Sequence, residues 1–146
     1  MRLYTIGFTK KSASQFFETL RNAGIKRVVD VRLNNVSQLS GFSKKQDLAY
    51  FLEKIDNIGY IHVPLLAPTQ ALLDSYKKHG GRWNEYEPGF LELMKERRIE
   101  ISWAPEMREA DCLLCSEEKP NHCHRRLVAE YLAAHLDGIK IEHLGV

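Results

Sequence analysis

The stretch that decides the fold is Asp111-Cys-Leu-Leu-Cys115, followed by Ser-Glu-Glu-Lys-Pro-Asn-His-Cys-His-Arg125 and then by segment 126–135. The first five residues contain the apolar run Cys112-Leu113-Leu114, which predicts a buried strand. Segment 126–135 carries apolar side chains at helical spacing, which predicts an amphipathic helix. The polar residues between them therefore form a strand-to-helix loop, the position at which open α/β sheets bind ligands.

The same alternation of strands and helices runs through the whole chain. We predict strands over 3–6, 27–32, 60–64, 111–115 and 140–144, with helices between them. Alternation of this kind predicts a three-layer α/β fold, in which a mostly parallel sheet of about five or six strands has helices on both faces. The length of 146 residues indicates a single domain, 1–146.

Helix starts are predicted from capping and proline signals. Ser12 with Gln15, and Ser43 with Gln46, fit the capping box, in which a serine precedes a glutamine by three residues. Pro68 is predicted to open a third helix, and Pro88 to lie in the first turn of a fourth. The second helix is expected to bury Leu48, Phe51, Leu52 and Ile55. Segment 99–107 is ambiguous, with a short strand over 100–103 as one interpretation.

Composition and charge place the protein among ordinary soluble globular proteins. The net charge of +2 is too small to indicate nucleic acid, and no apolar run is long enough for a membrane helix. The N-terminus begins with a strand-like run rather than a signal peptide, so we expect a cytoplasmic location, where thiols stay reduced. The three cysteines fall within 12 residues, which favours catalysis or metal binding over a disulfide framework.

Two predicted strand ends offer groups for an anion. Gly7 allows a close backbone approach, and Thr9 adds a hydroxyl beside a helix N-terminus. The alternative interpretation is a tight turn with a capping residue. Asp30 and Arg32 lie two residues apart on one face of a strand, so they can pair and leave part of the arginine fork for an anion. A purely structural ion pair explains them equally well.

The C-terminal loop carries the strongest candidate site. Cys123, His124 and Arg125 lie at the predicted start of the last helix, where free N–H groups and nearby cations are expected to lower the pKa of a thiol. Cys115 ends the preceding strand and is expected to come near Cys123. Glu117 or Glu118 is a candidate to orient His124 or to act as a general base.

Three interpretations of this loop compete. In the first, Cys115 or Cys123 is a nucleophile and His124 with a glutamate supplies acid–base chemistry. In the second, cysteines and histidines bind a structural zinc ion; Cys112 and Cys115 have ligand spacing, but side chains three apart on a strand face opposite sides. In the third, the cysteines are small buried apolar residues. We predict no metal and no cofactor. Segment 80–86 is interpreted as either a lid or a packed surface loop.

The motifs along the chain resemble the DUF488 family. The resemblance rests on Thr5-Ile-Gly7, Val29-Asp-Val-Arg32, Ser40-Gly-Phe42 and the pattern C-x-E-x-x-P-x-x-C-H-R formed by Cys115, Glu117, Pro120, Cys123, His124 and Arg125. One departure is that Phe8 and Thr9 stand where members often have histidine and serine. The resemblance implies that Glu117, rather than Glu118, belongs to the site. It names no reaction, because the family has no known function.

A looser similarity to rhodanese-like domains is limited to the D-V-R strand end and a cysteine before a helix. The ten residues from Cys115 to Arg125 are too many for the short anion loop of those proteins. The leading hypothesis is therefore a small enzyme or ligand sensor. Cys115, Glu117, Cys123 and His124 are its catalytic candidates, and Gly7, Thr9, Arg32 and Arg125 its anion-binding candidates. The expected partner is an anionic small molecule or nucleotide. The alternatives are a non-catalytic nucleotide- or nucleic-acid-binding module and a Cys/His structural metal site.

Overall fold

The computed structural model describes residues 1–34, 41–78 and 80–145. In chain order its helices and strands are β1 (Arg2–Gly7), α1 (Ala13–Asn22), β2 (Arg27–Asp30), the 3-10 helix η1 (Gly41–Ser43), α2 (Lys45–Asp56), β3 (Gly59–His62), the 3-10 helix η2 (Pro64–Leu66), α3 (Gln70–Lys78), α4 (Trp83–Arg97), α5 (Ile99–Ser102), the 3-10 helix η3 (Ala104–Glu106), β4 (Asp111–Cys115), α6 (His124–His135) and β5 (Lys140–His143).

All five strands form one parallel sheet in the order β3-β2-β4-β1-β5. The strand that precedes the candidate loop, β4, lies in the middle and pairs with β1 on one side and β2 on the other. Its register places Cys115 opposite Gly7, and Leu114 opposite Asp30. Three predicted site segments therefore end at the same rim of the sheet, and the three-layer α/β prediction is confirmed.

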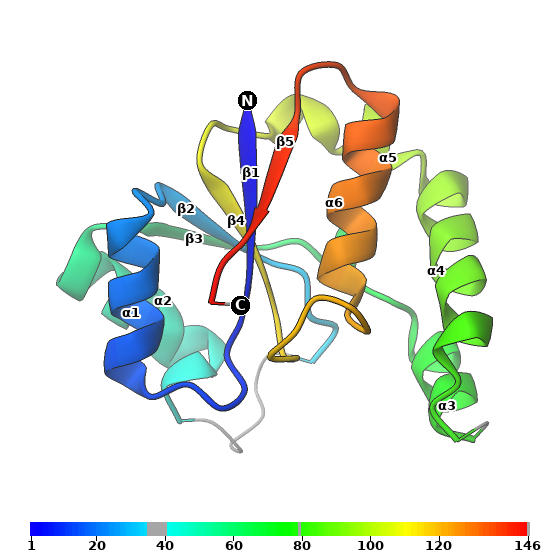
Figure 1. Cartoon of the computed structure of the whole chain (residues 1–146), viewed down its shortest axis with the longest axis horizontal. Helices are drawn as coiled ribbons and strands as arrows, with labels where there is room; N and C mark the ends of the chain where they lie inside the picture. Colours follow the sequence, from blue (N-terminus) through cyan, green and yellow to red (C-terminus); the bar gives the residue numbers. More distant parts are fainter. Residues whose placement is uncertain (35–40, 79, 146) are drawn as a thin grey trace.

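Helices cover both faces of the sheet, as Figure 1 shows. One face packs against α1 and α2 around a core that includes Phe16, Leu20 and Leu48. The other packs against α6, with α4 outside it, around a core that includes Phe90 and Val128. Successive side chains of a strand point to opposite faces, so β4 contributes residues to both cores.

Several local predictions are confirmed. Ser12 caps α1 with a full capping box: its hydroxyl accepts from the Gln15 backbone N–H, and the Gln15 side chain accepts from the Ser12 N–H. Thr69, directly after Pro68, accepts from the Leu72 N–H at the start of α3. The last strand, β5, lies at the edge of the sheet.

Two local predictions are wrong, and one ambiguous segment is resolved. The N-cap of α2 is Lys44, which makes no side-chain capping bond, because Ser43 belongs to the preceding 3-10 turn. Pro88 lies inside α4, which begins five residues earlier at Trp83. Segment 99–102, which the sequence left ambiguous, is a short helix, so the strand interpretation of 100–103 does not hold.

The buried face of α2 is narrower than predicted. Leu48 and Leu52 are buried, Phe51 is half-buried, and the side chain of Ile55 is 53% exposed. Most of the predicted loop after β2, together with Ser40 of the family motif, lies outside the described residues. Within the part of the chain that the structure describes, no helix is long and apolar enough to cross a membrane.

Candidate functional site

A cavity of about 420 Å³ opens at the rim where β4 and β2 end and α6 begins; we call it the rim pocket. It collects residues from the two loops after these strands, from α3 and α4, and from the start of α6. Its lining residues are Arg32, Leu33, Asn34, Pro68, Leu73, Tyr76, Trp83, Tyr86, Cys115, Ser116, Glu117, His122, Cys123 and His124. Of the eight residues predicted for the site, five lie here: Arg32, Cys115, Glu117, Cys123 and His124.

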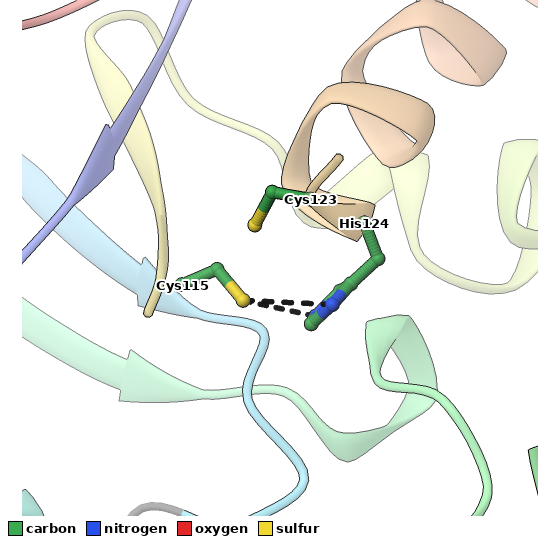
Figure 2. Close-up of side chains that lie close together, drawn as sticks. All are labelled: Cys115, Cys123 and His124. Carbon is green, nitrogen blue, oxygen red and sulfur yellow. Dashed lines mark hydrogen bonds between the residues drawn. The ribbon is translucent and has the colours of Figure 1, made fainter. Parts of the chain in front are cut away.

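Three of these residues, Cys115, Cys123 and His124, converge as what we call the Cys/His centre. Each offers one ligand atom, the three atoms lie within 4.8 Å of one another, and all three residues are buried. Figure 2 shows the three side chains turned toward one another, Cys115 from the end of β4 and the other two from the start of α6. The prediction that a tight loop brings Cys115 near Cys123 is confirmed.

The imidazole of His124 is fixed by a backbone carbonyl. Its Nε2 lies 2.6 Å from the carbonyl oxygen of Val31. A carbonyl oxygen only accepts hydrogen bonds, so Nε2 must carry the proton and donate it. In the neutral ring, Nδ1 is then left with its lone pair. The sulfur of Cys115 lies 3.5 Å from both ring nitrogens, beside the ring rather than in line with one of them.

Burial, rather than the helix terminus, governs Cys123. Its side chain is 2% exposed, and burial raises the pKa of the thiol well above its usual value, with the neighbouring Cys115 acting in the same direction. His124 and Arg125 act to lower this pKa, but their effect is weaker. The expectation that the helix N-terminus would give Cys123 a lowered pKa is therefore wrong, because that expectation ignored the desolvation of a buried sulfur.

Cys112 takes no part in the centre. It is fully buried on the other face of β4, where burial raises the pKa of its thiol. Alternation along the strand separates it from Cys115, as the sequence predicted, and it belongs to the apolar core.

Arg32 forms the charged part of the pocket wall. Its Nε and one terminal nitrogen donate to the two carboxylate oxygens of Asp30, at 2.9 and 2.8 Å, and the same terminal nitrogen donates to the Ser43 carbonyl. Burial lowers the pKa of the guanidinium, but the hydrogen bonds and charge of Asp30 outweigh this and raise the pKa. The predicted Asp30–Arg32 pair is present, and the Nη1 side of the fork has no bond within the described ranges.

Gly7, Thr9 and Arg125 hold the loop and do not line the pocket; we call them the loop clamp. Arg125 is fully buried, and its guanidinium donates to the backbone carbonyls of Glu117 and Glu118, at 2.6 and 3.3 Å, and to Thr5. The Thr9 hydroxyl donates to the Ser116 carbonyl. A Cβ added at Gly7 would overlap the Glu117 carbonyl oxygen. Gly7, Thr9 and Arg125 were predicted to bind an anion, but their contacts are with the backbone of the Cys115–Arg125 loop, whose position they fix.

Both glutamates of the loop line a second hollow beside Lys10. Glu117, which is exposed, also lines the rim pocket, whereas the carboxylate of Glu118 lies 3.6 Å from the Lys10 ammonium. The acid–base role expected of Glu117 stays a prediction.

An aromatic wall opposite β4 was missed from the sequence. Tyr76, Trp83 and Tyr86 line the pocket, and the His122 ring stacks on Trp83 with centroids 5.2 Å apart. Segment 80–86, which was interpreted from the sequence as either a lid or a packed surface loop, includes part of this wall. The aromatic residues were not recognised as a wall because the helix was predicted to start near Pro88, whereas Trp83 and Tyr86 lie in the first turn of α4.

The fold and the site define a small α/β protein with a buried Cys/His centre at the carboxyl end of a parallel sheet. The family model described as "Domain of unknown function DUF488" matches residues 12–132, and the chain belongs to this family. No curated protein and no solved structure gives a significant match.

Proposed function

We propose that the protein is an enzyme that binds an anionic small molecule in the rim pocket and acts on it by nucleophilic chemistry at the Cys/His centre. One observation carries the proposal: Cys115, Cys123 and His124 converge on the wall of a pocket that also contains Arg32. A cavity with few convergent polar groups among aromatic side chains is typical of a small-molecule site. The reduced thiols of the centre fit the cytoplasmic location that we also propose.

Each pocket residue has a role in this proposal. Arg32 binds the anion through the side of its fork that Asp30 leaves open, since a guanidinium is suited to planar recognition of carboxylate or phosphate. Glu117 is the acid–base group at the edge of the pocket. The nucleophile is the Cys115 sulfur if the centre holds no ion, with the lone pair of His124 Nδ1 beside it.

Anion binding tests the proposal directly. Calorimetric titration of the full-length protein with inorganic phosphate and with AMP should give saturable binding that Arg32→Lys weakens by roughly 10-fold, because lysine lacks the second arm of the fork. Arg126→Lys is the matched control, since Arg126 pairs with Glu87 outside the pocket. Equal affinities for all three proteins would contradict the proposal. Salt-dependent binding to a generic oligonucleotide, with no effect of Arg32→Lys, would instead favour the nucleic-acid-binding alternative.

A further inference from the structure

We propose that the Cys/His centre is a metal site, in which Cys115 Sγ, Cys123 Sγ and His124 Nδ1 hold one zinc-class ion with its remaining position open to the rim pocket. The three ligand atoms lie within 4.8 Å of one another. Two ligands of a tetrahedral zinc ion, at about 2.3 Å for sulfur and about 2.0–2.1 Å for nitrogen, are roughly 3.5 Å apart. The distance from Cys115 Sγ to His124 Nδ1 is 3.5 Å.

The orientation of His124 is that of a metal ligand. A metal-bound histidine usually donates its other ring N–H to a carbonyl or carboxylate, which fixes both the ring and its tautomer. The 2.6 Å contact from Nε2 to the Val31 carbonyl is such a bond. In the neutral ring this bond leaves the lone pair on Nδ1, the nitrogen that is then available to an ion.

The position of Cys123 gives independent support. It occupies the N-cap of α6, where serine, threonine, aspartate or asparagine is preferred because the side chain accepts a backbone N–H. Cys123 makes no such bond. Helix capping therefore does not account for the cysteine, and its sulfur points toward the end of β4, as a ligand role requires (Figure 2).

The ligand set indicates the class of ion and of site. Two thiolates and an imidazole suit zinc rather than magnesium or calcium, which prefer oxygen. Within the described residues, no fourth cysteine, histidine or carboxylate joins the group. A structural zinc site is closed by four protein ligands, whereas three ligands and an open position are typical of a catalytic one.

Ion binding forms two Zn–S bonds and releases the two thiol protons to solvent, with no change of oxidation state. The site then has no net charge, because two thiolates balance the ion. An anion held by Arg32 can therefore approach the open position without repulsion. The ion's part in the reaction rests on the proposed function, in which it would supply an activated water as the nucleophile. The binding of the ion to Cys115, Cys123 and His124 does not depend on the proposed function.

Metal content and cobalt substitution test the site. The full-length protein, without an affinity tag and grown with zinc, should contain about one equivalent of zinc. After chelation, titration with Co²⁺ should give thiolate-to-cobalt charge-transfer bands and the strong visible bands of a tetrahedral site. Cys115→Ala and Cys123→Ala should lose both signals. Cys112→Ala should keep them, since Cys112 lies on the other face of the sheet.

Less than about a tenth of an equivalent of zinc, with no charge-transfer bands on titration, would overturn the metal site. Equal loss in Cys112→Ala and Cys115→Ala would also overturn it. If Cys115→Ala does not fold, the wild-type titration alone decides. Phosphate binding without metal would leave the proposed function standing with Cys115 as nucleophile. Metal without anion binding would leave the site standing and refute the proposed function.

Discussion

The two faces of the central sheet differ in chemistry although they share the same strands. On the α1/α2 face, β4 contributes Cys112 to an apolar core, and a hollow of about 350 Å³ on this side has Phe17, Phe42 and Phe51 among its lining residues. On the α4/α6 face, three residues further along β4, Cys115 meets Cys123 and His124. The surroundings of these two thiols differ because of the elements packed against each face of the sheet, since both lie on the same strand. The sharpest tests therefore compare the two faces.

The largest contrast concerns thiol accessibility. Cys112 is fully buried in the core, so its alkylation should wait for global unfolding, whereas Cys115 lines the rim pocket. We expect iodoacetamide to modify native metal-free protein at Cys115 at least about a thousandfold faster than at Cys112. Peptide mass spectrometry after timed labelling measures both rates. Comparable alkylation rates at Cys112 and Cys115 would contradict the difference in thiol accessibility between the two faces of the sheet.

The next effect concerns the close contact between Gly7 and the backbone of Glu117 in the Cys115–Arg125 loop. Gly7→Ala would place a methyl group on the Glu117 carbonyl, and backbone cannot yield as a flexible side chain does. We expect the free energy of unfolding to fall by about 3 kcal/mol or more in urea denaturation. Gly59→Ala on β3 is the matched control, because its methyl would meet neighbours no closer than 3.6 Å. A small loss for Gly7→Ala would refute the packing described for the loop clamp.

Removal of the buried guanidinium should have a somewhat smaller effect. Arg125→Met leaves the Glu117 and Glu118 carbonyls without their donor, at a cost of about 2–3 kcal/mol in the free energy of unfolding. Arg126→Met, which breaks only partly exposed ion pairs, should cost less than about 1 kcal/mol. Urea denaturation of both variants compares them. If Arg125→Met has the same phosphate affinity and the same free energy of unfolding as the wild-type protein, Arg125 does not hold the loop.

The smallest effect is a pH dependence at the edge of the sheet. Burial lowers the pKa of the His143 imidazole below 6.5; Arg125 and Arg126 act in the same direction and Glu130 opposes them. The unfolded chain then takes up a proton more readily, so this contribution to stability is present above pH 6.5 and declines as the pH falls toward the folded-state pKa. His143→Gln should show a flatter decline in thermal unfolding between pH 7 and pH 5. Identical pH profiles would contradict this assignment.

Sequence reasoning predicted the part of this molecule that depends on local patterns. The parallel sheet, the strand that carries Cys115 and the opposite orientation of Cys112 follow from periodicity. What it could not predict depends on contacts between distant segments. The Val31 carbonyl that orients His124 lies 93 residues away in the chain. Arg125 looked like an anion ligand because nothing local shows that its fork turns back onto its own loop.

The place of β4 in the sheet has a consequence for how the protein is made. β1 and β2 pair with no common strand until residues 111–115 insert between them, so a nascent chain that ends before β4 can pair β2 with β3 but leaves β1 without a strand partner. In such a fragment the edges of β1 and β2 that β4 covers in the finished sheet are still exposed, and apolar strand edges invite association with other chains. A ribosome-bound chain should therefore stay susceptible to protease until β4 has left the exit tunnel, and it should gain its fold and its Cys/His centre almost together.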